Sequence, residues 1–358
     1  MAVDNKKIRK LDRREHDRTR ELYEAVFPED SQLFVDYYYD QVADENEIYV
    51  VEKEEEICAM LHLNPYEVHL DGDVYPLHYI VAVGTRQEYR HQGMMKSLLK
   101  ASLHEMYERK EPFTFLMPAD EAIYRPFGFG YFSEQNFRTV VPKEYRGCPA
   151  LECFRAEMAD VPDLAWEAER ILKEKYRVYA RRTEGYFARL LDEQEAQRGE
   201  VVVLAKERAP KGYLVYSAED ARVEIRELVV EPGLEEEVLG ALSDWFFYDE
   251  QIKVYGFPEK LENEDTVKKP LMMGRIVHLE AFLESLKSDI SIKLCFSITD
   301  EMIPENTGSY EAEITPFGGK VRQLEEMEVQ EKKPEKLELA ELLGRLLPKE
   351  SIFLHETV

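Results

Sequence analysis

Apolar residues along this chain recur either at every second position or at every third to fourth, which predicts a mixed succession of strands and helices. The clearest stretch lies between residues 79 and 118. Residues 79–84 form an uninterrupted apolar strand, and a second apolar strand covers residues 113–118. The segment between them, from about residue 93 to 108, has the spacing of an amphipathic helix. Its apolar face consists of Met95, Leu98, Leu99, Leu103 and Met106.

Three regions follow from this pattern. The first alternates helix and strand, with a helix at 14–27 that Pro28 ends and two predicted hairpins, 48–52 with 57–61 and 68–70 with 74–77. The second repeats that order weakly, with helices at 164–176 and 186–196, strands at 201–204, 212–216 and 223–230, a helix at 235–247 and a strand at 252–256. The third begins near residue 286, with strands at 291–298 and 310–314, a helix at 337–347 and a terminal strand at 351–358.

A basic turn joins the first apolar strand to its helix and reads Arg90-His91-Gln92-Gly93-Met94-Met95. The first turn of a helix offers free N–H groups and the positive end of the helix dipole, and both favour an anion. Gly93 lets the backbone approach a ligand closely. An ordinary surface turn would contain the same residue types, so the turn by itself leaves both readings open.

The strand, the Arg-x-x-Gly turn and the helix together resemble the acyl-CoA pyrophosphate loop of the GNAT N-acetyltransferases, except that Met95 replaces a small residue. The run Ile123-Tyr124-x-x-Phe127-Gly128-Phe129-Gly130 after the second strand is more specific. It resembles the enhanced intracellular survival family of N-acetyltransferases, whose best-known members acetylate aminoglycosides at several amines. Tyr124 could otherwise be a packing residue beside the neighbouring phenylalanines.

The resemblance implies acetyl-CoA as cosubstrate and direct transfer to an amine in a ternary complex. Backbone groups of Val83, Gly84 and Thr85 would bind the pantetheine arm. Tyr124 would act as the general acid, because a phenol with a pKa near 10 is protonated at neutral pH and can donate to the departing thiolate. The remaining cofactor-binding residues would be Arg90, His91, Gln92, Gly93, Met94, Met95 and Lys96 at the pyrophosphate, and Ala119 and Asp120 near the reactive end.

The general base has no obvious carboxylate on the strand at 79–84. In the resembling family the terminal carboxylate enters the active site, which would here be that of Val358. An α-carboxylate with a pKa near 3.5 is a weak base, so it would accept a proton from an amine that is already neutral, or through a water. His78, His355 and Glu356 are the alternatives, and a frayed chain end is the plain structural reading.

The expected fold class is α/β (α+β), with tandem GNAT domains followed by a sterol carrier protein-like domain. The expected boundaries are 1–145 for the domain with the acetyl-CoA site, 146–285 for a degenerate second GNAT domain, and 286–358 for the C-terminal domain. The second domain lacks a basic turn, and Glu235, Glu236 and Glu237 at its helix start would repel a pyrophosphate. The resemblance also implies a hexamer. The C-terminal domain could alternatively bind lipid in its own right.

Composition excludes some partner classes. With 73 acidic against 47 basic residues the net charge is −26, which argues against nucleic acid and anionic membranes and is compatible with cationic amines. No apolar run approaches the roughly 20 residues of a membrane span, and the start lacks the apolar core of a signal peptide. The four cysteines show no metal-type spacing, so we expect a cytoplasmic enzyme without a metal.

Two functions of different class remain: an N-acetyltransferase acting on aminoglycoside-like polyamines or lysine, and a non-catalytic scaffold or lipid carrier that keeps the GNAT fold. Substrate-pocket residues such as Glu29, Phe34, Tyr37 and Tyr38 can be named but not assigned. The three aromatic ones have helical spacing and could equally be core.

Overall fold

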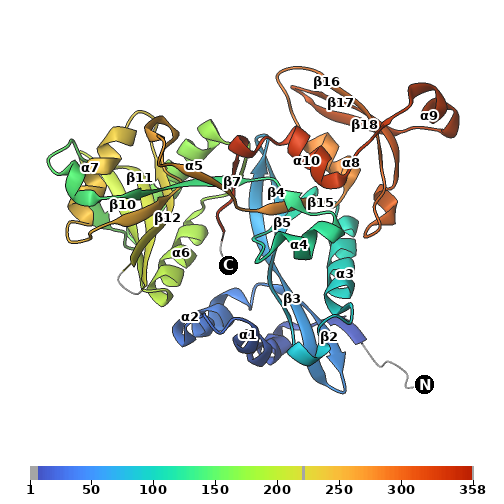
Figure 1. Ribbon diagram of the computed structural model, residues 1–358, viewed down its shortest axis with the longest axis horizontal. Helices are drawn as coiled ribbons and strands as arrows, with labels where there is room; N and C mark the ends of the chain where they lie inside the picture. Colours follow the sequence, from blue (N-terminus) through green and yellow to red (C-terminus); the bar gives the residue numbers. More distant parts are fainter. Residues whose placement is uncertain (1–6, 220–221, 357–358) are drawn as a thin grey trace. The chain divides into compact units, whose positions relative to one another are not determined.

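The computed structural model describes residues 7–219 and 222–356. The chain forms two compact units (Figure 1). One contains the described parts of residues 1–30, 38–133 and 271–358, and the other contains residues 31–37 and 134–270. These units differ from the three predicted segments, since residues 134–145 belong to the second unit and residues 271–285 return to the first. Both are mixed α/β structures, as the hydrophobic pattern predicted.

The central sheet of the first unit is antiparallel except at one pair of strands. Its strands lie in the order β1-β2-β3-β4-β5-β15-β6, and β4 and β5 run parallel. The bounds are β1 (Lys7–Lys10), β2 (Glu47–Lys53), β3 (Glu56–Leu70), β4 (Asp73–Thr85), β5 (Phe113–Leu116), β15 (Met273–Ile276) and β6 (Gly130–Tyr131). Strand β15 follows the second unit in the sequence, so the chain returns to complete the first unit only after residue 270.

Two long strands replace the four short ones expected in the first unit. The strands predicted at 57–61 and 68–70 are one continuous β3, and those predicted at 74–77 and 79–84 are one continuous β4. Pro65 and Pro76 lie within this ladder, opposite His78 and Glu67. A proline removes only its own donor, so the remaining pairs keep the ladder intact. The turn at Asp71 and Gly72 is where the sequence placed it.

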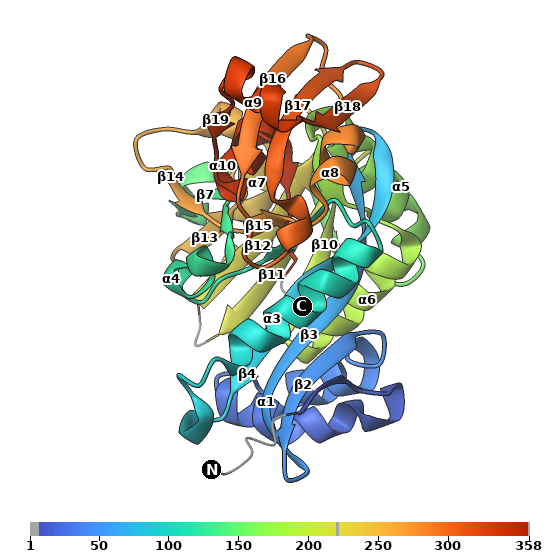
Figure 2. The same ribbon diagram turned by 90° about the vertical axis from the view of Figure 1, so that its right-hand side faces the viewer.

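Helix α3 (Met94–Glu108) packs against β2, β3 and β4 (Figure 2). Its buried apolar positions are Met94, Leu98, Leu99, Leu103 and Met106. The prediction was wrong in one position, because Met94 is buried and Met95 only half-buried. Burying side chains of this size contributes roughly 1.5–3 kcal/mol each, which fixes the rotation of α3 on the sheet. The other helices of the first unit before residue 133 are η1 (Arg13–Thr19), α1 (Arg20–Val26), η2 (Tyr38–Val42), η3 (Gln87–Tyr89), α4 (Glu121–Tyr124) and η4 (Arg125–Phe127).

The C-terminal part of the first unit has its own four-stranded sheet, in the order β18-β17-β16-β19. The strands predicted at 291–298 and 310–314 are β16 and β17, whereas β18 was not anticipated in its glycine- and lysine-containing segment. Helix α10 contacts β15 and β6, so this part packs on the first sheet. Its elements are α8 (Leu279–Ser285), β16 (Ile292–Ile298), η7 (Pro304–Asn306), β17 (Gly308–Thr315), β18 (Gly318–Gln323), α9 (Glu326–Lys332), β19 (Glu335–Lys336), α10 (Leu339–Leu346), η8 (Lys349–Ser351) and β20 (Ile352–Phe353).

The second unit repeats the predicted order of three strands, a helix and a strand. β12 and β13 run parallel, as β4 and β5 do in the first unit. Its sheet has the order β14-β7-β13-β12-β11-β10-β8. The elements are α2 (Gln32–Tyr37), β7 (Glu134–Val140), η5 (Pro142–Tyr145), β8 (Glu152–Arg155), α5 (Val161–Lys175), β9 (Val178–Ala180), α6 (Glu184–Ala196), β10 (Gly199–Lys206), β11 (Ala209–Glu219), β12 (Arg222–Val230), α7 (Glu235–Trp245), β13 (Ile252–Tyr255), η6 (Glu259–Leu261) and β14 (Val267–Pro270).

Candidate active site

The parallel strands β4 and β5 pair over a short stretch. In the described chain they pair at Tyr79 and Phe115. Further along β4 the register with β3 shifts, so that Ala82 and Val83 together face Leu61, and Ala82 has a φ of 50°. Such a bulge bends the strand that carries it. The predicted pantetheine-binding residues Val83, Gly84 and Thr85 lie at or just after this bend.

The predicted phosphate turn is open and basic. The side chains of Arg90, His91, Gln92 and Lys96 are exposed. Gly93 is the N-cap of α3 with a φ of 75°, and no atom lies within 4 Å of the position that a Cβ would take there. The first turn of α3 contains no acidic residue. Its N–H groups have no partner within the helix, so these residues fit the pyrophosphate of an acyl-CoA.

Two side-chain hydrogen bonds to backbone carbonyls lie within this turn. Arg90 Nε donates to the Thr85 carbonyl at 3.3 Å, and Gln92 Nε2 donates to the Glu88 carbonyl at 3.1 Å. His91 also has a left-handed backbone, with a φ of 61°, which the sequence pattern did not indicate.

In the corresponding turn of the second unit, a carboxylate of the chain itself occupies the start of the helix. The Glu235 carboxylate accepts a hydrogen bond from the Gly233 N–H at 2.9 Å and forms an ion pair with Lys260 at 3.1 Å. Glu236 and Glu237 share the first turn of α7. Three carboxylates at a helix start oppose a second anion, in keeping with the interpretation of this half as degenerate.

Tyr124 is the last residue of α4, the first helix after β5. Asp120 caps this helix, because its Oδ1 accepts from the Ala122 N–H at 2.9 Å, while Asp120 and Ala119 are themselves exposed. The Tyr124 ring lies edge-on to Phe129, with centroids 6.0 Å apart, and burial raises the pKa of Tyr124 to about 12.

The Tyr124 hydroxyl is largely buried together with its ring. The side chain is only 8% exposed. Yet among the described residues the hydroxyl has no hydrogen-bond partner, and it is not one of their fully buried unpaired atoms. The ring is therefore held by packing, and the hydroxyl is left available to a ligand. A protonated phenol in this position can donate to a leaving group.

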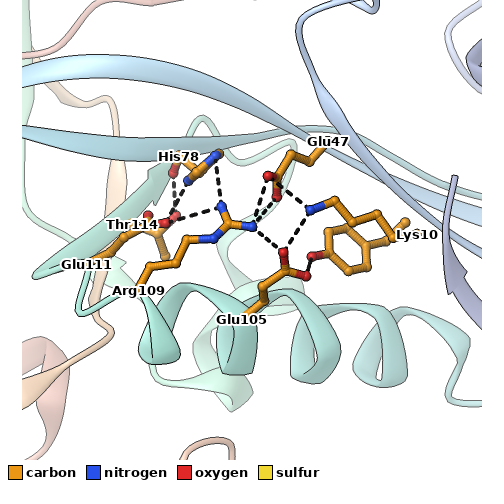
Figure 3. A network of polar contacts seen from close by, with 8 residues as sticks. Lys10, Glu47, His78, Glu105, Arg109, Glu111 and Thr114 are labelled. Carbon is orange, nitrogen blue, oxygen red and sulfur yellow. Dashed lines mark hydrogen bonds and ion pairs between the residues drawn. The ribbon is translucent and has the colours of Figure 1, made fainter. Parts of the chain in front are cut away.

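His78, one of the candidate bases, belongs to a polar network that is buried at His78 and Glu111 and reaches the surface at Arg109 and Glu47 (Figure 3). Its Nδ1 lies 2.8 Å from Glu111 Oε1, and its Nε2 lies 3.4 Å from Arg109 Nη1. Arg109 also binds both carboxylate oxygens of Glu47 at 2.9 Å. A ring with a carboxylate at one nitrogen and a guanidinium at the other is poorly placed to accept a proton from a substrate amine.

Of the C-terminal candidates, His355 and Glu356 are among the described residues. Val358 lies outside them, so the position of its carboxylate stays a prediction. Glu356 is buried, and the His355 ring lies 4.1 Å from that of Phe353. Among the named pocket candidates, Phe34, Tyr37 and Tyr38 are buried and Glu29 is exposed.

Sequence reasoning missed Arg275 of β15. Its side chain is buried and its Nη1 donates to the Phe127 carbonyl, in the turn directly after Tyr124. The available signal was a single arginine inside the apolar run 271–277. That run gave no indication that it would lie beside β6.

Residues 7–132 match the acetyltransferase (GNAT) domain family. The protein is an acetyltransferase enzyme. The match covers β1 to β6 with the phosphate turn and Tyr124, and acetyl-CoA is the cosubstrate of GNAT domains. It thereby decides between the enzyme and the non-catalytic scaffold in favour of the enzyme. No curated protein sequence matches the acetyltransferase.

Solved structures extend the likeness to the whole fold of the acetyltransferase. A probable N-acyltransferase from Enterococcus faecalis V583 is 18% identical, with a TM-score of 0.77 over 94% of this chain and 88% of that one. A GCN5-related N-acetyltransferase from Anabaena variabilis ATCC 29413 is 15% identical, with a TM-score of 0.80 over 99% and 100%. Eis1 from Mycobacterium abscessus is 17% identical, with a TM-score of 0.70 over 95% and 89%. At these identities the likeness shows a GNAT-type fold.

Two further properties of the described residues concern membranes and metals. None of their helices is both long and apolar enough to cross a membrane. No cluster of three or more His, Cys, Asp or Glu side chains in the same residues is arranged to hold a metal ion.

Proposed function

We propose that the enzyme is an acetyl-CoA-dependent N-acetyltransferase that acetylates amines by direct transfer in a ternary complex, with Tyr124 as general acid and the Val358 carboxylate as general base. The observation that carries the proposal is the presence in one unit of an open basic turn at α3 and, in the first helix after β5, a tyrosine whose hydroxyl has no hydrogen-bond partner among the described residues. Acyl transfer from coenzyme A needs a site that binds the phosphates and an acid that protonates the departing thiolate.

The neutral amine nitrogen attacks the thioester carbonyl carbon, a C–N bond forms and the C–S bond breaks. Tyr124 gives its proton to the departing sulfur, and the ammonium proton passes to the Val358 carboxylate directly or through a water. Arg90 and Lys96 would hold the phosphates by charge, and Val83 and Thr85 would align the pantetheine arm.

The acceptor class we propose is a polycationic amine, either an aminoglycoside-like compound or a lysine side chain. The net charge of −26 supports it, because a negative protein field raises the local concentration of cations. The likeness to Eis1 at 17% identity agrees with a place in the enhanced intracellular survival family, to which we assign the chain on the Tyr124 run. We extend this proposal to the sterol carrier protein-like character of residues 286–358 and to a hexameric, cytoplasmic enzyme.

The test is release of free thiol from acetyl-CoA with a native C-terminus, measured against aminoglycosides, polyamines and lysine peptides. Amine-dependent release would establish the reaction and rank the acceptors. Tyr124→Phe should then lower kcat by roughly 10²- to 10⁴-fold while acetyl-CoA binding persists. Full turnover by that variant would remove Tyr124 as the acid. Absence of release with every amine, despite acetyl-CoA binding, would refute the proposed acceptor class.

A further inference from the structure

Arg275 and Asp300 form an ion pair with almost no contact with solvent. The two Arg275 Nη2 distances to the Asp300 carboxylate oxygens are 2.6 and 2.7 Å, and each side chain is 1% exposed. Arg275 lies on β15, between β5 and β6. Removing both charges from water is costly, so a pair in this position calls for an account beyond general stability.

Asp300 is fixed by the chain around it. Its Oδ1 accepts from the N–H groups of Met302 and Ile303 at 2.9 and 3.0 Å, and its Oδ2 accepts from Asn306 Nδ2 at 3.0 Å. Asn306 in turn donates to the Val277 carbonyl at 2.8 Å, just after β15. The carboxylate therefore has one orientation, and it imposes that orientation on the Arg275 guanidinium.

The free edge of that guanidinium reaches the turn that follows Tyr124. Arg275 Nη1 donates to the carbonyl of Phe127, which is the last residue of η4. Gly128 follows with a φ of 81°, and a Cβ there would lie 2.3 Å from Nη1. Only glycine allows this close approach in this backbone conformation. The turn is thus shaped around the arginine.

The same turn places the tyrosine. Phe129, 2% exposed, follows Gly128 and packs edge-on against the Tyr124 ring. Within the described residues the Tyr124 hydroxyl has no partner of its own. Its position is therefore set by the backbone of 124–128 and by the Phe129 ring, and Arg275 holds both at the Phe127 carbonyl.

We propose that Arg275, oriented by Asp300, is a positioning residue for the Tyr124 general acid. The C-terminal part of the chain would then contribute to turnover through this ion pair as well as through its terminus. The inference rests on the proposed function, since it requires Tyr124 to donate the proton. The inference predicts an effect on kcat and not on cofactor affinity, because the phosphate turn at α3 has no part in the contact.

The test compares Arg275→Lys, Tyr124→Phe and the double variant. Lysine keeps the charge opposite Asp300 but lacks the second arm that reaches Phe127. We expect Arg275→Lys to lower kcat by about 10- to 100-fold, with the affinity for coenzyme A and the KM for acetyl-CoA unchanged. In the Tyr124→Phe background the same change should cause little further loss, because the acid that it positions is gone.

Arg182→Lys is the matched control, because Arg182 forms a buried ion pair with Glu227 in the other compact unit. It should lower Tm with kcat retained. If Arg275→Lys does not fold, Asp300→Asn serves instead, with the same sign of effect on kcat. Losses from Arg275→Lys and Tyr124→Phe that multiply, or an unchanged kcat in a folded Arg275→Lys, would overturn the inference while leaving Tyr124 as the acid. An unchanged kcat in Tyr124→Phe alone would instead remove the acid, and this inference with it.

Discussion

Nδ1 of His78 lies 2.8 Å from Oε1 of Glu111, and both side chains are buried between β4 and the start of β5. Because Arg109 approaches the other ring nitrogen, the imidazole is enclosed by charged partners. His78 therefore stabilises the join between α3, β4 and β5.

His78→Gln should consequently lower stability and leave chemistry intact. Loss of a partner for a buried carboxylate costs roughly 1–3 kcal/mol, so we expect a lower Tm. The pH dependence of kcat/KM should keep its shape. A folded His78→Gln enzyme with its turnover abolished and its pH limb removed would instead make His78 the base.

Arg90→Glu should weaken acetyl-CoA binding. The change replaces an attractive charge with a repulsive one at the turn that we assign to the pyrophosphate, and we expect roughly a tenfold loss or more at low salt. Lys100→Glu, an exposed charge reversal further along α3, is the matched control and should have a smaller effect. Equal affinities for acetyl-CoA in calorimetry for both variants would place the cofactor elsewhere.

Ionisation of Tyr124 should not limit activity on the alkaline side of the pH profile. Burial raises the pKa of Tyr124 to about 12, so the phenol stays protonated, and able to donate, from neutral pH to about pH 11. Activity should rise with pH as the acceptor amine loses its proton, and then reach a plateau. A fall in kcat with a midpoint below pH 10 that disappears in Tyr124→Phe would contradict this assignment.

Changes at the C-terminus should reduce turnover. If the Val358 carboxylate accepts the amine proton, deleting Val358 or extending the chain by a few residues displaces it, with the fold retained. We expect kcat to fall by roughly 10²-fold or more with unchanged acetyl-CoA affinity. A fully active enzyme with a C-terminal extension would exclude this carboxylate and redirect attention to Glu356 and His355.

Acid should destabilise the first unit through His62. Burial lowers the pKa of His62 to about 3, and its Nδ1 lies 2.8 Å from the Tyr38 hydroxyl. Between about pH 6.5 and 3 the unfolded chain binds a proton that the folded chain does not, so this contribution to stability is lost as the pH falls. The free energy of unfolding should drop by up to about 1.4 kcal/mol per pH unit in that window.

His62→Gln should reduce this slope, although it removes a buried contact as well. His104→Gln is the control, because His104 is 57% exposed on α3 and should leave the slope unchanged. Urea unfolding between pH 4 and 7 measures both. Identical pH slopes for the wild type and His62→Gln would show that other groups cause the acid sensitivity.

Local pattern carried much of the prediction in the first 131 residues. The helix at α3, the strands on either side of it and the turn at Arg90 follow from hydrophobic period and from the chemistry of helix starts, and both depend on residues near one another in sequence. The same reasoning found the order of β10, β11, β12, α7 and β13. It placed Met95 instead of Met94 inside, an error of one position that the packing of α3 on the sheet resolved.

The hydrophobic pattern could not predict which segments distant in sequence lie side by side. The four residues of β15 show no strand period of their own, and only the tertiary structure placed them between β5 and β6. Arg275 meets Asp300 across 25 positions of sequence and Phe127 across 148. The sequence by itself determined which side chains could hold a phosphate or donate a proton, because those properties belong to residue types and short turns. Tertiary structure alone decided that His78 is enclosed and that Arg275 reaches the Tyr124 turn, because burial and ion pairing depend on which distant segments fold against each other.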